Sequence, residues 1–411
     1  MTSGARLPVS VRHGDTSSSR SRGNRLRSLA AGALRRHGDD APKVILIVAG
    51  TRPECIKLAP VVQALENHPE LSIVLVNSGQ HLQAVHDSLA EFGLRADLEL
   101  ASLPKLPHLA ASHQHLRVEL RDAILRCQPD VVLVQGDTLT AYSGARAAHD
   151  TGHALAHVEA GLRTDTVLEP FPEEWFRRRI ARYAQIHFAP SRSAVDNLIG
   201  EGIDDRTVHH VGNTGIDSLR KILEDPERTP AHGRRVGNTV LVTLHRRANY
   251  DGNAAIVCDA LIDLAQARPE LRVLFPVHPN PRISAMIRRR LGAHAAFDLV
   301  DPMAYRDFVD SAARAALIIS DSGGIQEEAP HLGTPLLVPR CNTERPECLT
   351  TGFVRLVCVD RGAIVHAALD LLDAPRRPAV PLDVHAPFGA GNAAAMIVSV
   401  LETTLLERGH A

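Results

Sequence analysis

Short apolar runs alternate with longer amphipathic stretches from residue 43 onward. The first run, KVILIVAG at 43–50, is apolar almost throughout and ends in a glycine, which is typical of a strand buried on both faces. The stretch APVVQALENHP at 59–69 then has helical spacing. The same alternation predicts strands at 71–79, 130–137, 154–161 and 185–191, and helices at 82–94, 138–152 and 173–184. This order predicts a parallel, doubly wound sheet.

The alternation restarts after a polar break at residues 224–238. Further strands are expected at 239–245, 271–279, 297–302, 316–321 and 334–339, and further helices at 253–269, 283–292, 304–315 and 324–333. The predicted fold class is therefore α/β, with one Rossmann-like domain at 43–215 and a second at 216–388. A helix within 389–411 is expected to pack back on the N-terminal domain.

Residues 1–42 have a different composition. They are rich in Arg, Ser and Gly, poor in acidic residues, and lack the apolar centre of a secretory signal. We interpret them as a disordered basic tail or the product of a start codon assigned too early. A targeting segment or a basic arm is the alternative.

Composition narrows the class of protein. A chain of 411 residues is too long for one ordinary core, and a 3% aromatic content argues against nucleic-acid binding by base stacking. The net charge of −1 provides no general attraction to DNA or to a membrane, and no apolar run approaches the ~18 residues of a membrane span. The six cysteines form no CxxC pair and no zinc-site spacing, so we expect reduced thiols, no metal and a cytoplasmic location.

A candidate anion site follows the strand at 316–321. Ser322, Gly323 and Gly324 lead directly into a helix, and bare glycines let a phosphate approach the free N–H groups of a first helical turn. A plain strand–helix turn could use the same glycines. Neither GxGxxG nor a P-loop motif is present, so nicotinamide and P-loop interpretations lack their signatures.

Further candidates for nucleotide binding lie at other strand ends. Glu327 or Glu328, one turn into the same helix, could accept hydrogen bonds from a ribose, although either could be a surface glutamate. Arginine binds phosphate in a bidentate manner. The candidates for diphosphate contact are Arg52, His245, Arg246 and Arg247, each of which could instead have a structural role.

Three carboxylates form the candidate acid–base group. Asp137 and Glu159 follow strands, and Glu173 begins a helix on the same sheet edge. If they converge, at least one pKa rises, which supplies an acid and a base together, while Lys57 could keep another carboxylate ionised. Helix capping or a surface ion pair is the alternative for each. For Glu159 that alternative is weaker, because a charge inside the apolar run AHVEAG needs a reason.

The motifs together resemble the non-hydrolysing UDP-N-acetylglucosamine 2-epimerases of bacteria. The matching segments, in the order of the family, are GTRPECIKLAPVV, SGQH, VQGDT, HVEAGLRT, PFPEEWFRR, HFAPS, GNTGIDSL, VTLHRR, PVHPNP, SDSGGIQEEAPHLGTPLLV, TERPE and FGAGNAAAMI. The resemblance spans about residues 43–405. It implies a GT-B architecture with an interdomain active-site cleft, a homodimer, and no cofactor. It also implies interconversion of UDP-GlcNAc and UDP-ManNAc through elimination of UDP to 2-acetamidoglucal and re-addition.

The resemblance also assigns roles to individual residues. It implies that the catalytic residues are Asp137, Glu159, Glu173, Lys57 and His245. It implies that the residues binding the UDP-sugar are Arg52, Ser322, Gly323, Gly324, Glu328, Phe308, Arg345 and Arg246, with Tyr305 as an alternative to Phe308.

Two departures concern regulation and specificity. Ala248-Asn249 follows the HRR motif where the family usually has Glu-Asn, and the segment 97–117 lacks the usual Gly-Gln pair. In bacterial members that segment and the GQH motif, here with Gln80 and His81, help to bind a second, activating UDP-GlcNAc. Allosteric activation and the exact sugar therefore stay open.

Three other functions are compatible with parts of the pattern. A hydrolysing epimerase would release ManNAc and UDP, and a GT-B glycosyltransferase would share the UDP site but not need several carboxylates around C2. A non-catalytic UDP-sugar sensor would tolerate loss of those carboxylates. Asp137, Glu159 and Glu173 are all present, which favours the epimerase that retains UDP.

Overall fold

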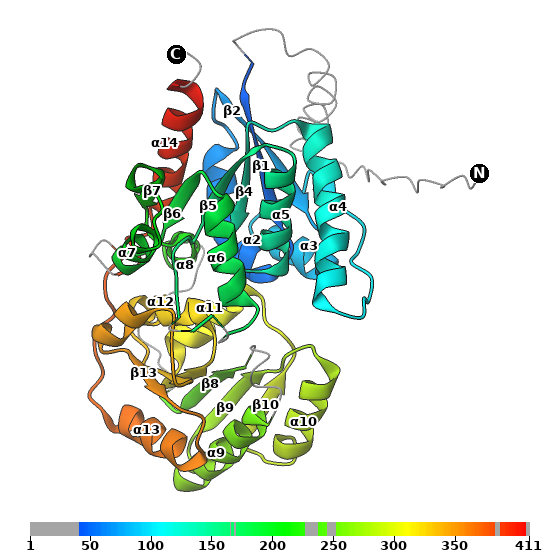
Figure 1. The fold of residues 1–411 in the computed structure, drawn as a ribbon. Coiled ribbons are helices and arrows are strands. Elements are labelled where there is room, and N and C mark those ends of the chain that lie inside the picture. Colours follow the sequence, from blue (N-terminus) through cyan, green and yellow to red (C-terminus); the bar gives the residue numbers. More distant parts are fainter. Residues whose placement is uncertain are drawn as a thin grey trace, which may run out of the picture. The chain divides into compact units, whose positions relative to one another are not determined.

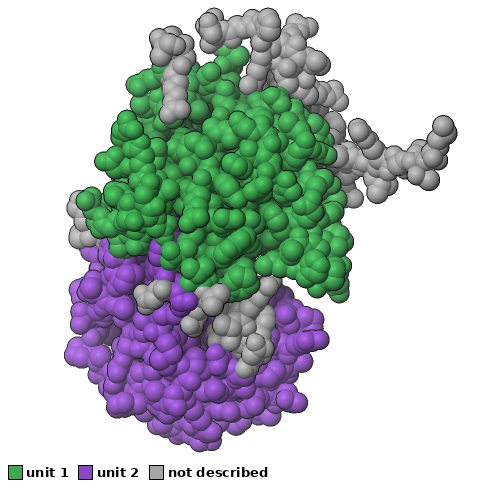
Figure 2. Space-filling model, viewed as in Figure 1, with its two compact units in different colours: residues 1–162, 167–214, 392–411 green, residues 163–166, 215–391 purple. Residues whose placement is uncertain are grey.

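The chain forms two compact units (Figures 1 and 2). The computed structural model describes residues 41–164, 166–167, 170–226, 237–244, 252–382 and 387–407, so the basic segment 1–40 lies outside the described residues. The first unit comprises the described parts of 1–162, 167–214 and 392–411, and the second those of 163–166 and 215–391.

The first unit is built on a seven-stranded parallel sheet with the order β3-β2-β1-β4-β5-β6-β7. Its strands are β1 (Lys43–Ala49), β2 (Leu71–Asn77), β3 (Leu98–Glu99), β4 (Val131–Gln135), β5 (Ala154–Val158), β6 (Ile186–Ala189) and β7 (Val208–His210). Alternate residues of β1 enter two cores, Ile45 and Ile47 on one face and Leu46 and Val48 on the other. The apolar run is thus a strand buried on both faces, as predicted.

Helices cover both faces of this sheet (Figure 1). They are α2 (Arg52–Leu65), α3 (Leu82–Glu91), α4 (Leu109–Cys127), α5 (Leu139–Asp150), α6 (Glu173–Tyr183), α7 (Arg192–Gly200) and α14 (Ala393–Leu406), with a 3-10 helix at Asp205–Thr207. One core contains side chains of α2, α3 and α14, and the other contains side chains of α4, α5 and α6. Helix α14, from the end of the chain, therefore completes the core beside α2.

The second unit has a six-stranded parallel sheet with the order β10-β9-β8-β11-β12-β13. Its strands are β8 (Thr239–Thr243), β9 (Arg272–Pro276), β10 (Phe297–Val300), β11 (Leu317–Ser320), β12 (Leu336–Pro339) and β13 (Val354–Val357). Its helices are α8 (Thr214–Leu223), which begins at the boundary, α9 (Asn253–Ala267), α10 (Pro281–Leu291), α11 (Tyr305–Arg314), α12 (Gly323–Leu332) and α13 (Arg361–Asp373), with a 3-10 helix at Pro346–Thr351.

The strand order reverses once in each sheet. The chain runs outward from β1 to β3 and then resumes at β4 on the other side of β1, and it does the same at β8 and β11 in the second unit. Open parallel sheets bind ligands beyond the carboxyl ends of their strands at such switch points. The loops after β1, β4 and β11 are therefore the places to look for a site.

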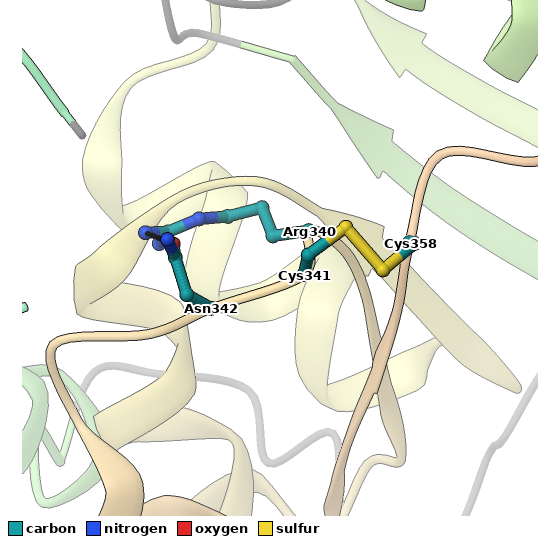
Figure 3. Close-up of a disulfide and its surroundings, with 4 residues drawn as sticks. All are labelled: Arg340, Cys341, Asn342 and Cys358. Carbon is teal, nitrogen blue, oxygen red and sulfur yellow. Dashed lines mark hydrogen bonds between the residues drawn. A yellow bond between two sulfur atoms is a disulfide. The ribbon is translucent and has the colours of Figure 1, made fainter. Parts of the chain in front are cut away.

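The predicted doubly wound α/β fold is confirmed in both halves, but two expectations from the sequence need correction. The expectation of six reduced thiols is wrong for Cys341 and Cys358, which form a disulfide between the ends of β12 and β13 (Figure 3). The prediction also omitted α4, although Leu116, Leu120 and Ile124 have helical spacing and are buried. Across the described residues, no helix has the length and apolar character that a bilayer crossing requires.

Candidate functional site

The loops after β1 and β4 meet at the switch point of the first unit. At Gly50, which follows β1, an added Cβ would overlap the hydroxyls of Thr140 and Ser78. The backbone of this loop therefore approaches α5 more closely than any side chain would allow. On the other side, Gly136 adopts a left-handed φ of 70° and turns the chain into Asp137.

Glu159 follows β5 and is surrounded by hydrogen-bond donors. Its backbone is left-handed, with φ 66°, which is uncommon for a residue other than glycine. One side-chain oxygen, Oε2, is ion-paired with Lys57 and accepts hydrogen bonds from Gln135 Nε2 at 2.9 Å and Asn213 Nδ2 at 3.1 Å. Glu159 is only 9% exposed, so these donors replace the water that would otherwise stabilise the charge.

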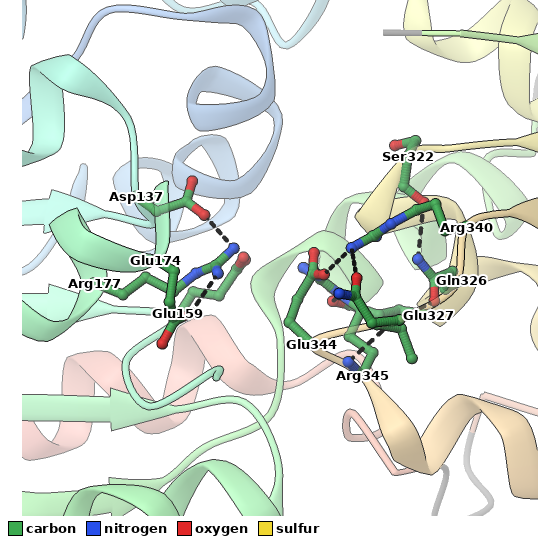
Figure 4. Close-up of polar contacts among 12 residues, drawn as sticks. Asp137, Glu159, Glu174, Arg177, Ser322, Gln326, Glu327, Arg340, Glu344 and Arg345 are labelled. Carbon is green, nitrogen blue, oxygen red and sulfur yellow. Dashed lines mark hydrogen bonds and ion pairs between the residues drawn. The ribbon is translucent and has the colours of Figure 1, made fainter. Parts of the chain in front are cut away.

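Asp137 is paired with an arginine of α6 (Figure 4). The Arg177 guanidinium forms an ion pair with Asp137, and its Nη1 also donates to Glu174 Oε2 at 3.0 Å. Glu174 is fully buried and accepts a second bond from Arg178 Nε at 2.9 Å. Glu174 therefore anchors Arg177, and Arg177 in turn orients Asp137, whose side chain stays 24% exposed.

The third predicted carboxylate begins α6. Glu173 is the first residue of that helix and is half-buried, and Glu174 directly after it has the anchoring role. A carboxylate at this position is favoured by the positive end of the helix dipole.

A fourth carboxylate, which sequence reasoning did not single out, lies at the same edge. Glu54 in the first turn of α2 is completely buried and accepts hydrogen bonds from Gly50 N at 3.0 Å, Thr51 Oγ1 at 2.8 Å and Thr138 Oγ1 at 2.7 Å. Burial raises the pKa of Glu54 to about 7, and the hydrogen bonds oppose that shift. The spacing Thr51-x-x-Glu54 resembles a capping box, which was the available signal.

Three other predicted residues lie near the loop after β1. Arg52 is the first residue of α2 and is partly buried. The side-chain oxygen of Gln80 accepts from Thr140 N at 2.9 Å and from Thr140 Oγ1 at 2.7 Å, so it holds the start of α5. His81 is the exposed N-cap residue of α3.

The switch point of the second unit carries the glycine turn. Ser322 is the N-cap residue of α12, and its N–H donates to Ser320 Oγ at 3.1 Å. An added Cβ at Gly324 would meet nothing within 4 Å, whereas one at Gly323 would overlap the Arg345 guanidinium. The first turn of α12 thus presents backbone N–H groups beside open space, which suits an anionic group.

The two glutamates of α12 have different partners. Glu327 forms an ion pair with Arg345, which also bonds Glu344 (Figure 4). Glu328 accepts a hydrogen bond from the Tyr305 hydroxyl at 2.8 Å. Arg345 is buried in this network and braces the glycine turn from within. Tyr305 is likewise buried and orients Glu328, while Phe308 on the same helix is half-buried.

Three predicted residues follow β8 and lie outside the described residues: His245, Arg246 and Arg247. Their proposed phosphate contacts stay predictions.

The sequence pattern indicated residues at the carboxyl ends of the strands but not several residues that contact them. The residues it missed are Glu54, Gln135, Arg177 and Asn213 in the first unit and the Glu328 contact of Tyr305 in the second. Gln135 directly precedes the predicted GDT motif, and Asn213 lies in the quoted GNTGIDSL, so both were within reach. Their contacts to Glu159 join distant segments, which no local pattern reveals.

Comparisons with known proteins agree on one family. A family model described as UDP-N-acetylglucosamine 2-epimerase matches residues 63–402. The UDP-N-acetylglucosamine 2-epimerase of Campylobacter jejuni is 36% identical over 372 residues, covering 87% of this chain and 97% of that protein.

Solved structures give the same result. The UDP-GlcNAc 2-epimerase from Neisseria meningitidis, bound to UDP-GlcNAc, superposes with a TM-score of 0.82 at 34% identity, covering 87% of this chain and 99% of that one. The enzyme of Methanocaldococcus jannaschii, in complex with UDP-GlcNAc and UDP, gives 0.77 at 29% identity, covering 87% and 99%.

Proposed function

Because the chain belongs to the UDP-N-acetylglucosamine 2-epimerase family, we propose that it interconverts UDP-GlcNAc and UDP-ManNAc while retaining UDP. The observation that carries this proposal is the largely buried Glu159 carboxylate, which pairs with Lys57 and accepts hydrogen bonds from Gln135 and Asn213. An ionised, largely buried carboxylate is what abstraction of a weakly acidic proton requires.

The proposed reaction has two balanced halves. A base removes the proton from C2 as the bond between C1 and the β-phosphate oxygen breaks, which gives 2-acetamidoglucal and UDP. UDP then adds again to C1, and an acid delivers a proton to the opposite face of C2. No electrons are exchanged with a cofactor, so the chain needs an acid, a base and a means of retaining UDP.

The first unit supplies the acid and the base in this proposal. Glu159 serves one face of C2. Asp137 and Glu173 are the candidates for the opposite face, and we assign this role to Asp137, because Arg177 fixes the orientation of its carboxylate, which stays 24% exposed. Lys57 acts by keeping Glu159 ionised.

The second unit binds the nucleotide in this proposal. The glycine turn Ser322–Gly324 binds the diphosphate through the Gly323 and Gly324 N–H groups and the Ser322 hydroxyl, and the Tyr305–Glu328 pair binds the ribose hydroxyls. Phe308 contacts the uracil, and Arg345 supports the glycine turn. Arg52, His245 and Arg246 add positive charge at the diphosphate, where Arg forms bidentate contacts. We also propose a homodimer, which light scattering would show as twice the 44.5 kDa chain mass.

The experiment that tests this proposal follows the chain with UDP-GlcNAc in D₂O by proton and phosphorus NMR. We expect UDP-ManNAc with deuterium at C2, while the diphosphate stays attached to sugar. Free ManNAc with UDP would establish a hydrolysing epimerase instead, and unchanged UDP-GlcNAc would refute the proposal. Asp137→Asn is the matched variant: it should bind UDP normally but epimerise about 10²-fold more slowly, the usual scale for loss of an acid–base group.

A further inference from the structure

One buried carboxylate connects the two loops at the switch point of the first unit. Glu54 Oε2 accepts hydrogen bonds from Gly50 N and Thr51 Oγ1, which belong to the loop after β1. Its other oxygen, Oε1, accepts from Thr138 Oγ1 at 2.7 Å, in the turn after β4. Because Glu54 has no exposed surface, it cannot touch a substrate directly, and its effect must pass through these partners.

Thr138 passes this constraint to its neighbour Asp137. Thr138 is the N-cap residue of α5, and its Oγ1 accepts from Ala141 N at 2.9 Å while the same hydroxyl donates to Glu54. The donor and an acceptor site of this hydroxyl are therefore both in use. On the other side of Asp137, Gly136 N donates to Val158 O at 2.9 Å. The backbone that carries Asp137 is thus fixed on both sides.

Burying the ionisable side chain of Glu54 costs free energy, and filling the space does not require such a side chain. An apolar side chain of similar size would fill the same space without the penalty of burying an ionisable group, and that penalty is visible in the raised pKa of Glu54, about 7. What an apolar side chain cannot do is accept three hydrogen bonds from two separate loops. The buried carboxylate therefore links the two loops, which an apolar side chain of the same size would not do.

We propose that Glu54 is a positioning residue, which fixes the orientation of Asp137 through the Thr138 hydroxyl. This inference rests on the proposed function, in which Asp137 transfers a proton at C2. Lys57 lies on the same helix three residues later and is paired with Glu159. The first turns of α2 therefore contact both carboxylates that transfer the C2 proton in the proposed function, Asp137 through Thr138 and Glu159 through Lys57.

The test compares three substitutions in the full-length chain. Thr138→Val removes the hydroxyl at nearly constant volume, and Thr138→Ser keeps it. Glu54→Gln replaces one acceptor oxygen with an NH₂ donor, so the side chain can no longer accept from both loops. We expect Thr138→Val and Glu54→Gln each to lower kcat about 10- to 100-fold with KM for UDP-GlcNAc changed less than about 3-fold, because a misoriented acid–base group affects the proton transfer and not the nucleotide contacts. Thr138→Ser, which keeps the hydroxyl, should leave kcat within about 3-fold of that of the unchanged protein.

A control separates positioning from simple loss of a helix cap. Ser191→Ala removes the N-cap hydroxyl of α7, which accepts from Ala194 N, is fully buried, and lies in the same unit. Its kcat should stay within about 3-fold. The combined variant Glu54→Gln/Thr138→Val should be no slower than the slower single variant, because both substitutions disrupt the same contact, between Glu54 and the Thr138 hydroxyl. Near-normal kcat in Thr138→Val, or fully multiplying losses in the combined variant, would overturn the proposal.

A second measurement does not depend on turnover. Hydrogen–deuterium exchange should quicken at residues 136–141 in Thr138→Val and Glu54→Gln but stay normal in Thr138→Ser. If the unchanged protein fails to epimerise UDP-GlcNAc but this exchange pattern appears, the proposed function fails while Glu54 still orders the Asp137 turn. If activity is present and exchange at this turn is the same in all variants, the positioning role is wrong.

Discussion

Single residues at the carboxyl edge of the first sheet hold their charges through specific partners. Glu159 keeps a left-handed backbone and is 9% exposed, yet it carries an ion pair and two amide donors on one oxygen. A carboxylate in such surroundings is stabilised only while the donors stay in place, since little water can replace them. Removing one donor should therefore change the protonation of Glu159 more than its position.

Replacing Lys57 with methionine tests this dependence. The Lys57→Met side chain fills similar space but carries no charge, so Glu159 should be protonated at neutral pH in a larger share of molecules. We expect kcat/KM to fall about 10²-fold at pH 7 and to recover partly at higher pH, where the carboxyl loses its proton even without the lysine. A pH–rate profile measures this shift. Lys43→Met is the control, because Lys43 pairs with Asp130 at the opposite end of β1; a profile unchanged in Lys57→Met would contradict the assigned role.

How far the site could be predicted depends on the distance in sequence between its parts. The strand-end rule located Asp137, Glu159 and the Ser322 turn, because each follows an apolar run directly. It did not locate Arg177, whose contact to Asp137 spans 40 positions of sequence between β4 and α6. Glu54 was missed for another reason: the interpretation of GTRPECIK concentrated on the cations Arg52 and Lys57, whereas the same segment contains a carboxylate directed into the protein.

At the scale of elements, the helix beginnings do most of the positioning. The first turn of α2 contains Glu54, the first residue of α6 is Glu173, and α12 begins at the glycine turn. Each of these helices follows a strand at the carboxyl edge of its own sheet, where the N–H groups and acidic side chains of a first turn suit anion binding and proton transfer. The alternation of strand and helix was predictable because each strand is a short apolar run, whereas β3, only two residues long, leaves no such trace.

The glycine turn of α12 gives a prediction at this scale. Gly324→Ala adds a methyl group that meets no protein atom within 4 Å, so the melting temperature should not fall. The methyl group would occupy the space proposed for the diphosphate, and we expect UDP to bind about 10-fold more weakly by calorimetry. In Gly323→Ala the methyl group would instead meet Arg345, which is held by two ion pairs, so that variant should also lose stability. Equal UDP affinity in Gly324→Ala would exclude this turn as the phosphate site.

At the scale of the whole molecule, the two sheets were predictable from local patterns, whereas the packing of the C-terminal helix was less so. Each sheet follows from its own run of local patterns, and the second unit ends where the chain passes residue 391. Helix α14 then supplies Ala394, Ile397 and Leu401 to the core of the first unit. Its apolar positions predict a buried face, but the core that it joins depends on contacts with segments far away in the sequence.

The pH dependence of stability follows from the buried titratable groups of the first unit. Burial raises the pKa of Glu54 from 4.5 to about 7, so between these values the folded chain binds a proton that the unfolded chain has lost. Its contribution is therefore fully present below pH 4.5 and is lost as pH rises through 7, by about 3 kcal/mol in total. The pKa of His113 is lowered from 6.5 to about 4, chiefly by burial, and this gives the opposite slope between these two values. Glu54→Gln removes only the first slope. The difference in melting temperature between the unchanged protein and Glu54→Gln should consequently shrink or reverse from pH 5 to pH 8, and a constant difference would show that Glu54 does not titrate in this range.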